Sequence, residues 1–273
     1  MTQANMNIVL AAGGISVQGV ISRAAEGQIG QEVSLPAADA GTLSTRTSDT
    51  AGTLTLGAGH GVTDRRAIRV ERREVEPYVA IHVVDALPAD CVRLALTELL
   101  DHRPDWVVSG INRGGNLGVD VFYSGTVAVA REAAFMGIPA VAVSQYVRAG
   151  IDEPDWDRAT AWTRPVLEHL FAEPPDERPP IWNVNLPSLE RSAEPRGRVV
   201  APMALTPLQV RYGRPTDDAG TDVEAESYQF AGQYSERPAP AGTDVHYAFN
   251  GHVTLTPLSL DLTYGRAMPE RQG

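Results

Sequence analysis

The segment Val107–Thr126 constrains this chain more than any other part of its sequence. An apolar run passes into Ser109-Gly110-Ile111-Asn112, a loop rich in glycine and asparagine follows, and Ser124-Gly125-Thr126 then opens a helix. This order of strand, loop and helix gathers polar groups at the carboxyl end of a strand, where open α/β sheets bind their ligands. Because the first N–H groups of a helix lack partners within it, the helix that starts at Ser124 can hold an anion. The segment therefore predicts a ligand pocket.

Strands and helices alternate from the N-terminus to about residue 181, which is typical of a mostly parallel sheet with right-handed crossovers. The later apolar runs are short and alternating, which indicates antiparallel strands. We expect one α/β domain over residues 1–273: a three-layer, Rossmann-like, mostly parallel sheet with a C-terminal antiparallel β extension. The expected strands cover residues 7–10, 32–35, 78–84, 106–109, 140–144, 182–186 and 253–256, and the expected helices cover residues 19–29, 124–136, 156–173 and a segment from residue 88.

Three further segments have distinctive compositions. Residues 37–62 are rich in Ala, Gly, Ser and Thr and predict a loop with some β-hairpin, at the rim of the pocket. Residues 214–241 are rich in Pro, Gly and acidic residues and predict an extended arm or lid within the domain. Pro165 is expected to kink or break the helix that contains it.

The charge of the chain limits its partners. The formal net charge is -11 and the pI is about 5.0, so we expect neither nucleic acid nor an anionic membrane as a partner. A small anion remains a suitable ligand, because a helix N-terminus acts locally. All basic residues are arginine, which excludes lysine nucleophiles and Schiff bases.

The chain has the features of a cytoplasmic protein. Cys91 is its single cysteine, so no disulfide can form within the chain, as in a reducing compartment. Residues 1–7 lack the basic start of a signal peptide, and no apolar run is long enough to cross a bilayer. We therefore expect a cytoplasmic location.

Residues of the predicted pocket are the candidate ligand contacts. Asn112 and Asn116 can donate hydrogen bonds to a ligand, Asn112 also as a catalytic residue, or they can shape the loop through their own main chain. The main-chain N–H groups at Ser124, Gly125 and Thr126 can bind a phosphate, a carboxylate or a developing oxyanion. Ser124 can serve at the same time as an ordinary N-cap.

Four other side chains have a functional and a structural interpretation. For Ser109, the functional interpretation is a contact with the ligand, and the structural one is the turn from the strand into the loop. For Arg113, the functional interpretation is an ion pair with an anionic substrate, and the structural one is an exposed loop side chain. Asp120 is a general base or a brace for the loop. His60, in the flexible sequence Gly-Ala-Gly-His-Gly-Val, is the candidate acid–base residue among the histidines, which show no metal-ligand spacing.

Short motifs follow one another in order from residue 88 to residue 244: Pro88-Ala89-Asp90-Cys91-Val92, Ser109-Gly110-Ile111-Asn112, Asn116-Leu117-Gly118, Tyr123-Ser124-Gly125-Thr126, Gly137-Ile138-Pro139-Ala140, Asn183-Val184-Asn185-Leu186-Pro187 and Gly242-Thr243-Asp244. These blocks resemble the SurE family, the stationary-phase survival proteins. The resemblance implies a SurE-like fold and metal-dependent phosphatase activity on nucleoside monophosphates (5′/3′-nucleotidase). It also implies a homodimer or higher homo-oligomer, for which residues 214–241 are the expected contact.

The chain departs from this family at the metal site. The family's first strand ends in Asn-Asp-Asp-Gly, and the matching positions place Ala12 and Gly13 where the metal-binding aspartates stand. A metal-binding serine after the second strand matches Gly41, and Ser44 nearby is a candidate anion contact. Mg²⁺ and Mn²⁺ require carboxylate oxygens to replace their hydration shell. We therefore expect no metal and no cofactor.

The loss of these ligands decides the function expected from the sequence. Asn112 alone remains of the four metal ligands that the resemblance implies. We expect a SurE-like scaffold repurposed as a metal-independent enzyme for a small, anionic or carbonyl-bearing molecule, with the loop 109–116 and the helix start 124–126 as its pocket. Two alternatives stay open: a non-catalytic ligand-binding or regulatory relative, and a metal-dependent nucleoside monophosphate phosphatase, as in the family.

Overall fold

A computed structural model gives the structure of the chain. It describes residues 7–11, 17–21, 60–63, 66–75, 78–100, 103–148, 155–172, 180–207, 210–214 and 228–262. The expected strand at residues 32–35 and most of the loop predicted at residues 37–62 lie outside these ranges. Ala12, Gly13, Gly41 and Ser44 lie outside them as well.

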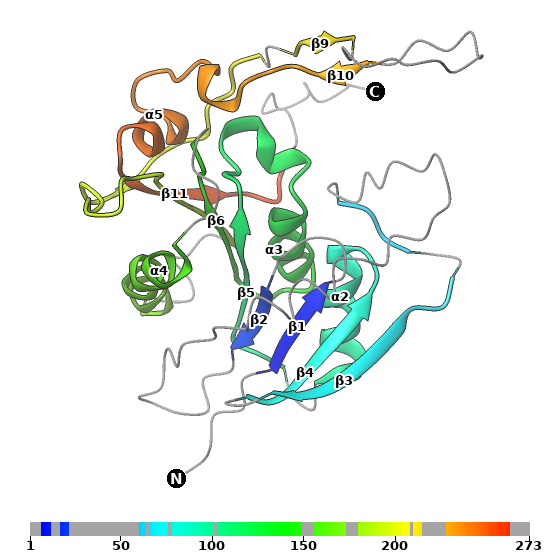
Figure 1. The fold of residues 1–273 in the computed structure, drawn as a ribbon. Helices are drawn as coiled ribbons and strands as arrows, with labels where there is room; N and C mark the ends of the chain where they lie inside the picture. The colour runs from blue at the N-terminus through cyan, green and yellow to red at the C-terminus, as the bar shows by residue number, and fades with distance from the viewer. Residues whose placement is uncertain are drawn as a thin grey trace, which may run out of the picture.

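One large sheet organises the described part of the chain (Figure 1). Its order is β3-β4-β1-β2-β5-β6-β7-β11-β8. The strands β5, β6 and β7 at its centre are parallel, whereas β11 runs antiparallel to β7. The strands are β1 (Asn7–Ala11), β2 (Val17–Ile21), β3 (Arg69–Val75), β4 (Tyr78–Asp85), β5 (Trp106–Arg113), β6 (Ala140–Gln145), β7 (Ile181–Leu186), β8 (Arg198–Val200) and β11 (Val253–Leu258).

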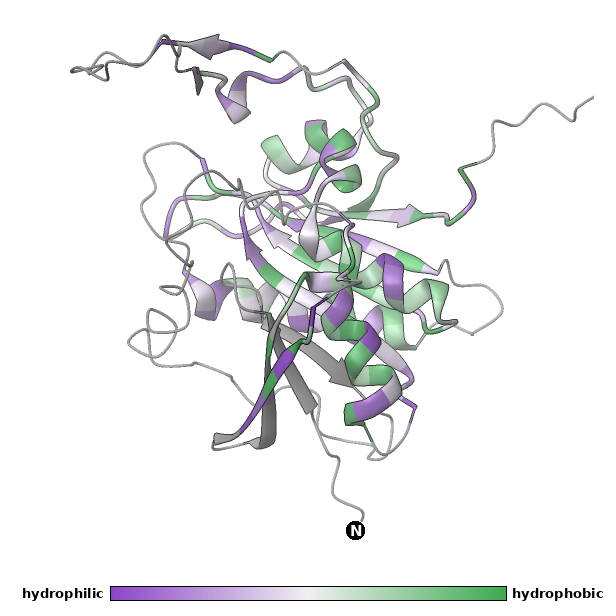
Figure 2. Ribbon diagram, turned by 90° about the vertical axis from the view of Figure 1, so that its right-hand side faces the viewer, coloured by the Kyte–Doolittle hydropathy of each residue, from purple (hydrophilic) through white to green (hydrophobic). Residues whose placement is uncertain are grey.

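Helices cover both faces of this sheet and complete three layers (Figures 1 and 2). Helices α2 (Pro88–Leu94) and α3 (Gly125–Phe135) lie on one face, and α4 (Trp156–Phe171) lies on the other. Successive strand residues point to opposite faces, so Ala140 and Ala142 pack in the α3 cluster, whereas Val141 and Val143 pack in the α4 cluster. This arrangement confirms the predicted α/β, Rossmann-like fold with its C-terminal antiparallel extension.

The predicted helix at residues 19–29 is wrong at its start. Val17–Ile21 form β2, which pairs antiparallel with both β1 and β5. The β-branched residues Val17, Val20 and Ile21 fit a strand between two neighbours better than a helix. The strand β3, which the sequence analysis did not predict, forms the edge of the sheet beside β4. Helix α4 continues through Pro165 and is not broken there.

The region predicted as an arm, residues 214–241, is described in part, and it includes a strand that pairs with residues just before it. Strands β9 (Tyr212–Gly213) and β10 (Gln229–Phe230) pair in a small separate sheet that stands away from the main one (Figures 1 and 2). A 3-10 turn, η3 (Tyr234–Glu236), then leads back to helix α5 (Asp244–Phe249), which lies beside β11. We call residues 233–237 the arm root.

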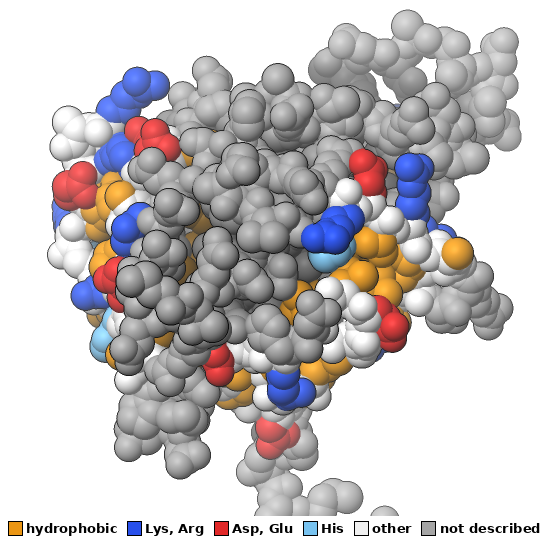
Figure 3. Space-filling view, turned by 90° about the horizontal axis from the view of Figure 1, so that it is seen from below, with side chains coloured by type: hydrophobic (Ala, Val, Ile, Leu, Met, Phe, Trp, Pro, Cys, Tyr) orange, Lys and Arg blue, Asp and Glu red, His pale blue; other side chains and the backbone are white. Residues whose placement is uncertain are grey.

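The surface carries charges of both signs. On the face seen from below, arginine and acidic side chains are interspersed over the described part of the chain (Figure 3). Among the described residues, no helix is long and apolar enough to span a membrane.

Candidate functional site

The start of helix α3 is built as the sequence predicts. Ser124 is its N-cap, with extended backbone, and its Oγ accepts a hydrogen bond from the N–H of Val127 at 3.1 Å. The geometry of a helix leaves the N–H groups of Gly125 and Thr126 without partners inside it. These N–H groups and the positive end of the helix dipole suit a phosphate or carboxylate.

The carboxyl end of β5 leads into this helix. Asn112 is partly exposed, and its side-chain amide donates to the main-chain oxygen of Gly114 at 2.8 Å, which shapes the turn that follows the strand. Arg113 is exposed at the last position of β5. Of the candidate ligand contacts, these side chains reach solvent at the strand end.

Asn116 anchors the loop to the sheet. Its side chain donates to Ser144 Oγ at 2.6 Å, and its main-chain N–H donates to Asn185 Oδ1 at 2.8 Å. Its main-chain oxygen accepts hydrogen bonds from the side-chain amides of Asn183 and Asn185, at 2.8 and 3.1 Å. The structure therefore supports the loop-shaping interpretation of this asparagine.

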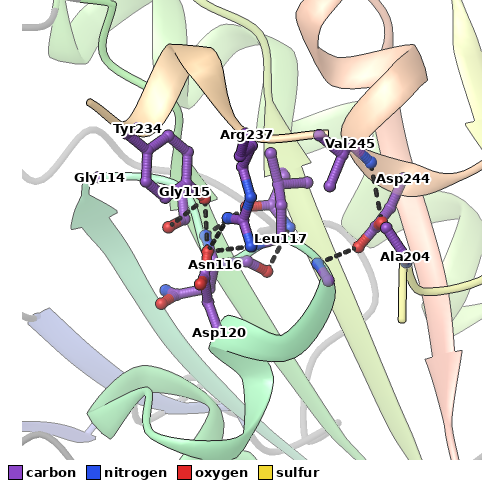
Figure 4. Close-up of polar contacts among 12 residues, drawn as sticks. Gly114, Gly115, Asn116, Leu117, Asp120, Ala204, Tyr234, Arg237, Asp244 and Val245 are labelled. Carbon is purple, nitrogen blue, oxygen red and sulfur yellow. Dashed lines mark hydrogen bonds and ion pairs between the residues drawn. The ribbon is translucent and has the colours of Figure 1, made fainter. Parts of the chain in front are cut away.

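A second anchor holds the loop to helix α5. Asp244 is fully buried and accepts hydrogen bonds from the N–H groups of Gly118, Ala204 and Val245 at 2.7 to 2.9 Å (Figure 4). Burial raises the pKa of this carboxyl group above its ordinary value, although the three main-chain donors oppose that effect. Both ends of the segment 116–118 are thus tied to fixed elements.

Asp120 is the centre of a third set of contacts, which we call the Asp120 cluster (Figure 4). Its carboxylate accepts hydrogen bonds from the hydroxyl groups of Tyr123 and Tyr234, the latter at 2.6 Å, and forms an ion pair with Arg237 at 2.5 Å. It also accepts the N–H of Leu117 at 3.3 Å. Asp120 is buried, and protein donors engage both of its oxygens, so the geometry supports a brace rather than a general base.

The pKa values of the cluster follow from its burial. Burial, with the hydrogen bond and charge of Asp120, raises the pKa of Tyr123 to about 12 and that of Tyr234 further. Burial alone would lower the pKa of Arg237, but its hydrogen bond to Asp120 reverses this, and the pKa is raised. All three groups therefore remain hydrogen-bond donors at neutral pH.

Ser109 and His60 lie apart from the exposed strand end. Ser109 is fully buried, and its hydroxyl has no hydrogen-bond partner among the described residues. The imidazole of His60 contacts Glu132 at 2.6 Å on helix α3, and Arg93 of α2 contacts the same carboxylate at 2.5 Å. Since Glu132 lies about 10 Å along the helix from Gly125, His60 is not placed beside the helix start.

Of the four positions at which the family resemblance implies a metal ligand, the structure describes only Asn112. Alanine and glycine, at the matching positions 12, 13 and 41, offer no side-chain donor. Within the described part of the chain, no group of three or more His, Cys, Asp or Glu side chains could hold a metal ion. The neutral amide of Asn112 is the one matching donor that the structure places.

Sequence reasoning missed the residues that hold the loop. Asn183 and Asn185 interrupt an otherwise apolar strand at a spacing of two, which puts both on one face of the sheet, so their pattern could have revealed them. No local pattern marks Tyr234 and Arg237, which meet Asp120 from 114 and 117 residues away in the chain.

Comparisons with known proteins agree with this geometry. The family described as "Survival protein SurE" matches residues 55–209, a range that contains the β5–α3 unit and lies after positions 12, 13 and 41. The chain is 39% identical over 207 residues to a 5′-nucleotidase SurE from Synechococcus sp. (strain JA-3-3Ab), covering 75% of this chain and 76% of the relative. It is also 39% identical over 209 residues to a 5′-nucleotidase SurE from Heliobacterium modesticaldum, covering 75% and 72%.

A solved structure supports the same assignment. The crystal structure of the SurE protein from Aquifex aeolicus superposes with a TM-score of 0.59 and 32% sequence identity, over 75% of this chain and 78% of that chain. The family match covers more than half of the 273 residues. The chain belongs to the SurE family.

Proposed function

We propose that this protein binds nucleoside monophosphates and hydrolyses their phosphate ester, with the phosphate at the N-terminus of helix α3. The observation that carries this proposal is the Ser124 cap, which leaves the N–H groups of Gly125 and Thr126 at the positive end of an intact helix. The names of the relatives, 5′-nucleotidase SurE, support the same chemistry.

The residues at this helix start would bind and orient the phosphate. The main-chain N–H groups of Gly125 and Thr126 would donate to its oxygens, and the Ser124 hydroxyl can donate its proton while its oxygen caps the helix. Arg113 would add positive charge from the end of β5. In the reaction, the oxygen of a water molecule forms a new bond to phosphorus and the ester P–O bond breaks. A proton lost by that water is gained by the leaving oxygen, so the nucleoside leaves as an alcohol.

The metal-independent enzyme expected from the sequence is not supported by the relatives. They fit the phosphatase alternative better, since they share the family and most of their length with this chain. The expected substrate, a small anionic molecule, remains open. The names of the relatives favour a nucleotide as that molecule.

A second candidate is a relative that binds nucleotides without turnover. The sequence feature in its favour is that Ala12, Gly13 and Gly41 stand where the resemblance to the family implies metal-binding side chains. Without such donors, the charge that develops on the transferred phosphoryl group would lack its usual counter-charge. The helix start would then still bind the phosphate.

Phosphate release from a panel of nucleoside monophosphates, with and without Mn²⁺ or Mg²⁺, separates the two candidates. The proposal predicts turnover of at least one nucleotide. Saturable nucleotide binding by calorimetry without turnover under any condition would establish the second candidate in its place. An aryl phosphate in the same panel shows whether the nucleoside is recognised at all.

We also propose a homodimer or higher homo-oligomer, as the resemblance implies, with its contact in residues 214–241 and in β9, which pairs with β10 of that segment. In support of this, the β9–β10 strands and the residues beside them expose large apolar side chains: Val210, Tyr212, Tyr228 and Phe230 are each more than half exposed. Exposed aromatic groups of this kind are typical of interfaces. A cytoplasmic location stays a prediction.

A further inference from the structure

The Asp120 cluster joins three parts of the chain. The side chain of Asp120 accepts the N–H of Leu117 in the loop, and its main-chain oxygen accepts the N–H of Ser124, the α3 cap, at 3.0 Å. Tyr234 and Arg237 reach the same carboxylate from the arm root (Figure 4). One residue therefore contacts the loop, the helix start and the arm root.

The arm root is itself held in a fixed position. The guanidinium of Arg237 lies over the ring of Tyr234 at 4.7 Å, and the ring of Tyr234 lies 5.8 Å from that of Tyr146, at the end of the central strands. The hydroxyl of Tyr234 also donates to the main-chain oxygen of Gly115 at 3.1 Å. The arm root is thus packed against the loop on one side and the sheet on the other.

The ion pair in this cluster is buried. The side chain of Asp120 is 6% exposed and that of Arg237 is 13% exposed. A buried carboxylate without its partner charge carries a field that water screens poorly. Because Asp120 adjoins the N-cap of α3, an uncompensated negative charge there would oppose any anion at the helix start.

We propose that Asp120 is a positioning residue that couples the arm root to the phosphate-binding end of α3, and that Arg237 neutralises it so that the helix can hold an anion. This inference rests on the proposed function for the identity of the ligand. It predicts that the site's affinity for phosphate depends on Arg237 through its contact with Asp120.

The test compares Arg237→Met, Asp120→Asn and the double variant by calorimetric titration with AMP. We expect Arg237→Met to weaken AMP binding by about tenfold or more, because it leaves Asp120 charged and unpaired. The double variant removes both charges, so it should bind AMP more tightly than Arg237→Met alone. Arg158→Met is the matched control, since Arg158 also lies over an aromatic ring, that of Trp162, but on α4.

Wild-type affinity in Arg237→Met, or a double variant weaker than Arg237→Met, would overturn the proposal. A purely structural role predicts the second result, because each substitution would then add to the damage. Thermal unfolding of each variant shows that the protein titrated is folded.

Amide hydrogen exchange separates this proposal from the proposed function. If the wild-type protein binds no AMP, the proposed function fails, and the coupling is decided by exchange alone. Arg237→Met should then accelerate exchange of the amides from Leu117 to Val127, whereas Arg158→Met should not. Unchanged exchange in that segment would overturn the coupling.

Discussion

At the scale of single residues, Gly110 is required by both space and backbone conformation. Its φ is +126°, and a Cβ atom built there would lie 2.2 Å from the main-chain oxygen of Val143 on β6. We predict that Gly110→Ala lowers the free energy of unfolding by about 3 kcal/mol or more, measured by chemical denaturation.

Gly197 provides the matched control for this prediction. Its φ is +135°, but a Cβ atom there would meet nothing within 4 Å. Gly197→Ala therefore tests backbone strain alone and should lower the free energy of unfolding by about 1–2 kcal/mol. Equal losses in the two variants would show that the close approach to Val143 has no energetic importance.

Cys91 should be chemically silent in the folded protein. It is fully buried on α2, and burial raises the pKa of its thiol to about 12. The raised pKa means that this group's contribution to stability is complete below pH 9 and is lost as the pH rises toward 12, because the unfolded thiol ionises first.

We predict that iodoacetamide at about pH 8 leaves the native protein unmodified and alkylates it fully in urea, as mass spectrometry would show. Rapid alkylation without denaturant would mean that α2 opens readily or that the thiol is exposed.

The role of a single residue could be predicted from the sequence where the groups that it contacts lie close to it in the chain. Ser124 as a cap follows from its place before a helical segment, and the structure confirms it. The environment of Asp120 depends on Tyr234 and Arg237, which no local pattern connects to it. For this reason the sequence left the general base and the brace open as alternatives.

At the scale of elements, the Asn-Val-Asn pattern of β7 holds the loop that precedes α3. We predict that Asn185→Ala lowers the free energy of unfolding by about 1–3 kcal/mol, because it leaves the N–H of Asn116 buried without an acceptor. Hydrogen exchange at the Asn116 amide should accelerate in the same variant.

Asn250→Ala is the control for the loss of an asparagine side chain. Asn250 is exposed, and its amide donates to the main-chain oxygen of His246 at 2.8 Å. Asn250→Ala should lower the free energy of unfolding by less than about 0.5 kcal/mol. If Asn185→Ala cost no more than this, the loop would not depend on β7.

Elements were predictable where the periodic pattern is long and continuous, as in α3 and α4. The segment at β2 is short, and its strand character depends on β1 and β5 on either side. Tertiary pairing of this kind overrides weak local preferences, which explains the wrong helix at residues 19–21. The strand β3 likewise acquires its structure from pairing with β4.

At the scale of the whole molecule, the β9–β10 strands should join copies of the chain. The rings of Tyr212 and Phe230 lie 6.0 Å apart in an edge-to-face arrangement and are 64% and 57% exposed. We predict a dimer or larger assembly by light scattering, and a shift toward the monomer in the double variant Tyr212→Ser/Phe230→Ser.

Val200→Ser, at 63% exposure on the edge strand β8, is the control and should leave the assembly unchanged. A monomeric wild-type protein at micromolar concentration would contradict this account of the arm.

The central claim is that the main-chain N–H groups at the start of α3 bind the phosphate of a nucleotide, and Gly125 allows a direct test. Ser124 has φ −71° and ψ 126°, a conformation that tolerates a following proline, and proline is accepted at the first position of a helix. Gly125→Pro therefore removes one N–H donor and keeps the helix, whereas Gly125→Ala keeps the donor.

The decisive measurement is calorimetric titration of AMP into these two variants. A hydrogen bond to a charged group contributes about 1.5–3 kcal/mol, so Gly125→Pro should bind AMP about tenfold or more weakly than Gly125→Ala. Equal affinity of the two variants for AMP would contradict the placement of the phosphate at this helix.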